Sequence, residues 1–140
     1  MDNDFKQIKG DGLMLNRWTG VGMVGKDGID LRYSPNGKPV ANFKIGCKRN
    51  FKTNDKYEWD NLSIVYWGQG AEYLARNAEE KTMVSVDGRI QSRSYQTNDG
   101  QTRWVTEIIA DNVTVVSPKG GVTPEQMGNE VSFDDSDIPF

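Results

Sequence analysis

Val84-Ser85-Val86-Asp87-Gly88-Arg89-Ile90-Gln91-Ser92-Arg93-Ser94-Tyr95 alternates with the two-residue period of a β-strand. One phase carries small or apolar residues: Val84, Val86, Gly88 and Ile90. The other phase carries Asp87, Arg89, Gln91, Arg93 and Tyr95. A glycine in mid-strand permits the sharp bend or bulge that a small closed barrel needs. The stretch therefore predicts a curled strand with an inward apolar face and a charged outer face.

Two guanidinium groups and a phenol ring on one strand face can contact phosphates and a base together, as on single-stranded nucleic acid. A merely solvated strand face is the commoner outcome for any single strand. The choice depends on whether other strands repeat the pattern.

The length and the rare residue types limit the possible classes of protein. A chain of 140 residues is expected to form one domain with flexible ends. It has no run near the ~18 apolar residues of a membrane span and no signal-peptide pattern, so we expect a cytoplasmic protein. The sequence contains one cysteine, Cys47, and no histidine. It thus predicts no disulfide within the chain, no metal site and no cofactor.

The net charge of −3 is unevenly distributed along the chain. Residues 119–140 hold five acids and one base, whereas residues 1–118 hold 16 bases and 15 acids. The body is near neutral, and it can still bind phosphate if its bases gather on one surface.

Two further segments repeat the pattern of one apolar and one polar face. Residues 40–49 place Ala41, Phe43, Ile45 and Cys47 opposite Lys44 and Lys48, and residues 59–67 place Leu62, Ile64 and Tyr66 opposite Trp59 and Trp67. Residues 50–58, between these strands, are expected to form a long exposed loop.

The remaining segments complete a recognisable order of elements. Residues 14–25 predict a bent first strand that continues into residues 29–33, and Ala71, Leu74, Ala75 and Ala78 follow helical spacing. Residues 102–116 predict a last strand whose inward phase is unclear, because Glu107 and Asp111 interrupt it; a bulge would resolve this. Five strands with one short helix between the third and fourth predict a mainly β OB-fold, a Greek-key barrel. The fold alone does not identify the ligand.

Several stretches in this order resemble the single-stranded-DNA-binding protein family of bacteria and their phages. They are Met14-Leu15-Asn16-Arg17, Leu31-Arg32-Tyr33-Ser34-Pro35-Asn36-Gly37, Val40-Ala41-Asn42-Phe43, Val86 to Tyr95, Thr106-Glu107-Ile108, and the end Asp134-Asp135-Ser136-Asp137-Ile138-Pro139-Phe140. The resemblance implies that bases stack on Phe51, Trp67 and Tyr95. A further family aromatic aligns near Asn61, where Trp59 is the nearest substitute on the same face.

From the residues and the resemblance together, we expect a sequence-tolerant binder that protects single-stranded DNA during replication, recombination and repair. The residues expected to contact DNA are Arg17, Lys44, Lys48, Arg49, Phe51, Trp59, Trp67, Arg89, Arg93, Tyr95 and Trp104. For Trp104 a structural role is an equal alternative. The resemblance also implies a homotetramer in a bacterial cytoplasm or a phage-infected host, associated with the nucleoid.

The chain is divided into an N-terminal extension (1–13), the OB-fold (14–118), a flexible linker (119–133) and an acidic end (134–140). The tail is expected to be disordered. Its end combines charge with a single aromatic anchor and is expected to dock replication, recombination and repair proteins. The residues involved are Asp134, Asp135, Asp137, Ile138, Pro139 and Phe140.

Two other functions remain as alternatives. The first is a replication assembly protein, similar to primosomal OB-fold proteins, whose barrel mainly contacts other proteins. The second is a metal-dependent nuclease using Asp87, Glu107 and Asp111, although these acids form no recognisable motif.

Overall fold

The computed structural model describes residues 12–117 of the chain. The elements are β1 (Trp18–Val24), β2 (Asp30–Tyr33), β3 (Pro39–Thr53), β4 (Lys56–Trp67), α1 (Gln69–Asn77), β5 (Met83–Gln96) and β6 (Thr102–Ser117). Most of the N-terminal extension, the linker and the acidic end lie outside the described residues, so the predictions made for them stay predictions.

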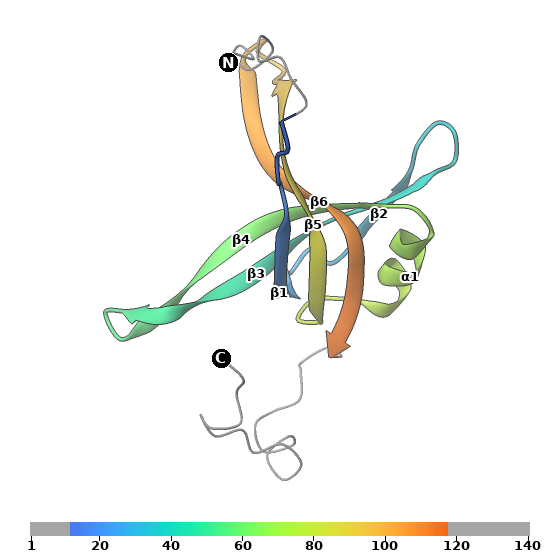
Figure 1. Cartoon of the computed structure of the whole chain (residues 1–140). Coiled ribbons are helices and arrows are strands. Elements are labelled where there is room, and N and C mark those ends of the chain that lie inside the picture. Colours follow the sequence, from blue (N-terminus) through green and yellow to red (C-terminus); the bar gives the residue numbers. More distant parts are fainter. Residues whose placement is uncertain (1–11, 118–140) are drawn as a thin grey trace.

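The six strands form one sheet in the order β1-β5-β6-β4-β3-β2, and β1 also pairs with β3. That second pairing joins Met23 to Gly46 and Val24 to Ile45, and it closes the sheet into a barrel (Figure 1). The predicted first strand is interrupted and appears as β1 and β2. With this pair counted as one bent strand, the structure confirms the five-stranded OB-fold and its single helix.

The predicted inward faces form the core of the barrel. Ala41, Phe43 and Ile45 of β3 are buried together with Ile64 of β4, as the alternation predicted. Helix α1 adds Ala71 and Leu74 to the same hydrophobic cluster. Each large aliphatic side chain buried in this way contributes about 1.5–3 kcal/mol to the free energy of unfolding.

A bulge between β5 and β6 resolves the unclear phase of the last strand. Asp87 pairs with Asn112, but Gly88 pairs with Ala110, which leaves Asp111 as the extra residue. Gly88 approaches the partner strand so closely that a Cβ built there would lie 2.2 Å from the Ile109 carbonyl oxygen. The glycine therefore allows the bend that its position predicted.

The prediction that Ile90 points into the core was wrong, since its side chain is 43% exposed. Beyond Ile90 and its partner Ile108, strand β6 pairs with β5 alone, and the two strands continue as a long arm (Figure 1). Ile108, the cross-strand partner of Ile90 on the same face, is 4% exposed and belongs to the core, so Ile90 lies at the edge of the core. Ile90 therefore keeps the predicted phase but is only partly covered.

The long exposed loop predicted for residues 50–58 was also wrong. Strand β3 continues to Thr53 and β4 begins at Lys56, so only Asn54 and Asp55 form the turn. Both have positive φ, 52° and 65°, as a tight two-residue hairpin turn requires. The aromatic residues of this segment therefore lie on a second arm of paired strands (Figure 1).

Candidate nucleic-acid interface

The register of the sheet places most of the predicted contact residues on one side of it. Cross-strand partners share a face, and β3 pairs with β4 through Val40 and Trp67, Lys44 and Ser63, and Lys48 and Trp59. Val65 of β4 pairs with Ile109 of β6. The same side continues on β5, where Ile109, Val105 and Arg103 pair with Arg89, Arg93 and Tyr95. We call this side the aromatic-basic face; it carries Lys44, Lys48, Trp59, Trp67, Arg89, Arg93 and Tyr95.

Three aromatic rings on the aromatic-basic face remain accessible. Trp59, Trp67 and Tyr95 are 49%, 42% and 46% exposed. The indole of Trp59 lies close to Gly46, where a Cβ would come within 3.3 Å of its Cε3 atom. Half-exposed rings of this kind have area left to bury against a planar partner.

Lysine ammonium groups lie beside two aromatic rings of this region. Lys48 Nζ is 4.3 Å and Lys52 Nζ is 5.3 Å from the centre of the Tyr57 ring, and Lys38 Nζ is 5.4 Å from the centre of the Trp67 ring. Such cation–π pairs place a positive charge next to a stacking surface. Tyr57 and Lys38 were not predicted as site residues. The pairing of β3 with β4 brings both residues to this region. The sequence did not predict this register, because residues 50–58 were expected to form a loop.

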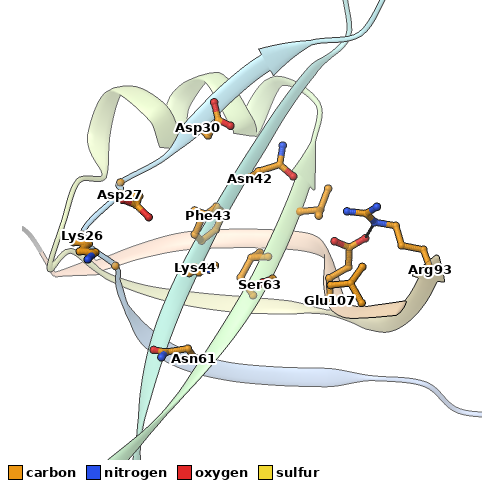
Figure 2. A pocket seen from close by; sticks show the side chains of 15 residues that line it. Lys26, Asp27, Asp30, Asn42, Phe43, Lys44, Asn61, Ser63, Arg93 and Glu107 are labelled. Carbon is orange, nitrogen blue, oxygen red and sulfur yellow. Dashed lines mark hydrogen bonds and ion pairs between the residues drawn. The ribbon is translucent and has the colours of Figure 1, made fainter. Parts of the chain in front are cut away.

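A groove of ≈ 530 Å³ lies on the aromatic-basic face between one wall, formed by residues 25–28 and the start of β2, and strands β3, β4, β5 and β6 (Figure 2). Its bases are Lys26, Lys44 and Arg93, and its acids are Asp27, Asp30 and Glu107. Asn42, Asn61 and Ser63 add uncharged polar groups. The groove can therefore offer hydrogen bonds of both kinds with little net charge.

Arg93 and Glu107 form an ion pair at one end of this groove. Arg93 Nε donates a hydrogen bond of 2.7 Å to Glu107 Oε1 (Figure 2). The Glu107 side chain is 6% exposed, whereas that of Arg93 is 52% exposed. A buried carboxylate thus holds an arginine that is accessible from the groove.

Arg49 and Arg17 are each held by two carboxylates. Arg49 is bound by Asp60 and Glu58. Arg17 lies 2.5 Å from Asp87 and 3.6 Å from Asp111. Both guanidinium groups are thus partly neutralised, and their predicted contact with DNA stays untested.

Two predicted aromatic residues are placed differently from the other three. Trp104 pairs with Ser94, so it points to the opposite side of the β5–β6 arm from Arg93 and Tyr95. Phe51 lies where the register between β3 and β4 shifts, and it is 61% exposed. The structure does not bring either ring together with the groove.

Comparison with known proteins identifies the family of the chain. The family model described as the single-strand binding protein family matches residues 15–116. The chain belongs to this family. A single-stranded DNA-binding protein of Oceanobacillus iheyensis is 45% identical over 108 residues, which is 76% of this chain and 66% of that protein.

Two other relatives of this family member match over longer stretches. Single-stranded DNA-binding protein 2 of Listeria monocytogenes is 38% identical over 125 residues, covering 86% of this chain and 78% of the relative. Single-stranded DNA-binding protein 3 of Streptococcus agalactiae is 35% identical over 139 residues, covering 91% of this chain and 100% of the relative. The chain spans about two thirds of the Oceanobacillus protein and the full length of the Streptococcus agalactiae protein.

The acids considered for a nuclease are engaged with arginines. Asp87 and Asp111 both contact Arg17, and Glu107 contacts Arg93. Within residues 12–117 no three acids or cysteines come together as a group that could hold a metal ion. The same part of the chain has no helix long and apolar enough to cross a membrane.

Proposed function

We propose that this protein binds and protects single-stranded DNA with little sequence preference. The observation that carries the proposal is the aromatic-basic face, where half-exposed Trp59, Trp67 and Tyr95 share one side of the sheet with Lys44 and Arg93. Aromatic rings stack on any base, and lysines and arginines contact the backbone phosphates. The names of the relatives support the same conclusion.

A competition assay tests this function. The protein is bound to a fluorescent dT oligonucleotide and challenged with unlabelled single strands of mixed sequence and with duplex of equal length. We expect every single strand to compete and the duplex to compete poorly, because the base faces are stacked on each other in a duplex. A preference for duplex would exclude the proposed mode of binding.

The process in which this activity is used is replication, recombination and repair, where single strands are exposed. The bacterial cytoplasm, at the nucleoid or in a phage-infected cell, is the corresponding place. A replication assembly protein that mainly contacts other proteins remains the second candidate. The accessible aromatic rings favour DNA, because an assembly role does not require base stacking.

The acidic end, residues 134–140, is proposed to recruit partner proteins. It combines Asp134, Asp135 and Asp137 with Phe140, which offers a basic partner surface both charge and an aromatic anchor. Deleting residues 134–140 should abolish capture of partners from a host extract and leave affinity for DNA unchanged or slightly higher at low salt. Capture of the same partners by the truncated protein would refute this role.

A homotetramer is the proposed assembly. One OB-fold covers only ~4–16 nucleotides, and linked sites on one strand raise the total affinity without new contacts. Light scattering should return about four times the chain mass of 15.7 kDa. A single-chain mass at micromolar concentration would contradict the proposal.

A further inference from the structure

Glu107 is an unexpected residue on a surface that is proposed to bind a polyanion. Its side chain is 6% exposed, although it lines the groove of the aromatic-basic face. A buried carboxylate is costly unless it is paired and hydrogen-bonded. It would also repel a nearby phosphate. Its presence at this place therefore requires a compensating contact.

That contact is made by Arg93, and it uses only part of the arginine. Nε donates to Glu107 Oε1 at 2.7 Å. Across the described residues, the terminal nitrogens Nη1 and Nη2 of Arg93 donate no hydrogen bond to another protein group. Both terminal nitrogens remain available on a side chain that is 52% exposed.

Arg93 can therefore make two contacts at once, with Nε bound to Glu107 and the two terminal nitrogens directed to a ligand. The guanidinium group is planar and rigid, so a bond that fixes Nε also fixes the plane in which the two terminal nitrogens lie. Those nitrogens form a fork that matches two oxygens of a phosphate. A lysine has one ammonium group and cannot present such a fork while it is bound to a buried acid.

We infer that Glu107 is a positioning residue that orients Arg93 for a backbone phosphate at the groove. This inference rests on the proposed binding of single-stranded DNA. The carboxylate neutralises part of the charge of Arg93, but it also fixes the orientation of the two terminal nitrogens before DNA binds. Fixing a side chain before binding lowers the entropy that binding costs.

The variant Glu107→Ala gives opposite results for the two possible roles of the acid. If Glu107 only repels phosphate, its removal should raise affinity for DNA. If it positions Arg93, affinity for dT oligonucleotides should fall about tenfold, the size expected for one hydrogen bond to a charged group. Glu80→Ala is the matched control. Glu80 is exposed and does not line the groove, so this substitution removes the same charge at a distance from the proposed site.

Two conservative variants separate positioning from charge and from folding. Glu107→Gln keeps an oxygen acceptor for Arg93 Nε, so its affinity should stay within about twofold of the wild type. Arg93→Lys keeps the positive charge but loses the fork, so it should bind about as weakly as Glu107→Ala. Thermal unfolding of each variant shows whether it is folded at the temperature of the assay.

The double variant Arg93→Ala/Glu107→Ala completes the test. Removing Glu107 after Arg93 should cause no further loss of affinity, because a positioning residue has nothing left to orient. Additive losses, unchanged or higher affinity in Glu107→Ala, weak binding by Glu107→Gln, or wild-type affinity in Arg93→Lys would each overturn the inference. Failure of the wild-type protein to bind any single strand would instead overturn the proposed function.

Discussion

The guanidinium of Arg49 reaches the carboxylate of Asp60 with two hydrogen bonds, 3.1 Å from Nε and 2.9 Å from Nη2. The remaining terminal nitrogen, Nη1, lies 2.7 Å from Glu58 Oε2. This clamp joins β3 to β4 just where their register shifts, between Lys48 and Lys52. The hydrogen bond from Arg49 lowers the pKa of Asp60 below its ordinary value, and Asp60 raises the pKa of Arg49.

The clamp should make the stability of the protein depend on acid pH. Because the folded pKa of Asp60 is lowered, its contribution is present above the unfolded pKa, about 4, and is lost as pH falls through the folded value. Thermal unfolding of the wild type and of Asp60→Asn, measured from pH 7 to pH 2.5, checks this. The wild type should unfold at a slightly higher temperature than Asp60→Asn, and the difference should be small because the pair is exposed. This difference should shrink below about pH 4. A difference that stays constant with pH would show that Asp60 contributes nothing through its charge.

Arg49 should contribute less to DNA binding than Lys44. All three guanidinium nitrogens of Arg49 already bind carboxylates, whereas Lys44 forms no ion pair in the part of the chain that the structure describes. Lys44→Gln should reduce the slope of log K against log salt by about 0.7, the value for one phosphate contact on a single strand. Arg49→Gln should change that slope less. Equal changes in the two variants would mean that the clamp opens when DNA binds.

The contribution of an aromatic ring to DNA binding should depend on the side of the sheet on which the ring lies. Trp67→Ala and Tyr95→Ala remove rings from the aromatic-basic face, so each should cost about 1–3 kcal/mol of binding free energy for all sequences alike. Trp104→Ala removes a ring of similar exposure from the opposite side of the β5–β6 arm and should cost less. Anisotropy titrations with dT and mixed-sequence oligonucleotides measure all three. A larger loss for Trp104 would place the DNA on the other side of the arm.

Gly88 is expected to be intolerant of any side chain. A Cβ at this position would lie 2.2 Å from the Ile109 oxygen and 2.8 Å from the Ala110 Cα, and neither backbone atom can move without disturbing the bulge. Gly88→Ala should lower the free energy of unfolding by about 1–3 kcal/mol or more. Gly12→Ala is the control, since nothing lies within 4 Å of a Cβ there. Chemical denaturation compares the two, and similar midpoints would argue against the close approach.

The alternation of single strands predicted much of this structure because it depends on local sequence. It identified the inward residues Phe43, Ile45 and Ile64 and the face that carries Trp59, Trp67 and Arg93. It could not predict where the strands leave the barrel. Ile90 therefore had the right phase and the wrong environment, because covering it depends on residues distant in sequence.

Contacts between side chains of different strands could not be predicted from the sequence, because they depend on how the strands pair. In the sequence Glu107 stands out as an acid in an apolar strand and as a candidate metal ligand, whereas its bond to Arg93 depends on the pairing of β5 with β6. The hairpin at Asn54 and Asp55 was missed because a polar, charged segment is also typical of a loop. Two adjacent residues that tolerate positive φ were the available signal for a tight turn.

Tryptophan emission during titration with poly-dT tests the central proposal most directly. Trp59 and Trp67 lie half exposed on the aromatic-basic face, so stacked thymines should quench their emission until the sites are saturated. Added salt should reverse the quenching, because phosphate contacts are screened. We expect quenching by poly-dT and little by duplex DNA of the same length. Emission that does not change with poly-dT, or that falls equally with duplex, would contradict the proposal that this face binds single-stranded DNA.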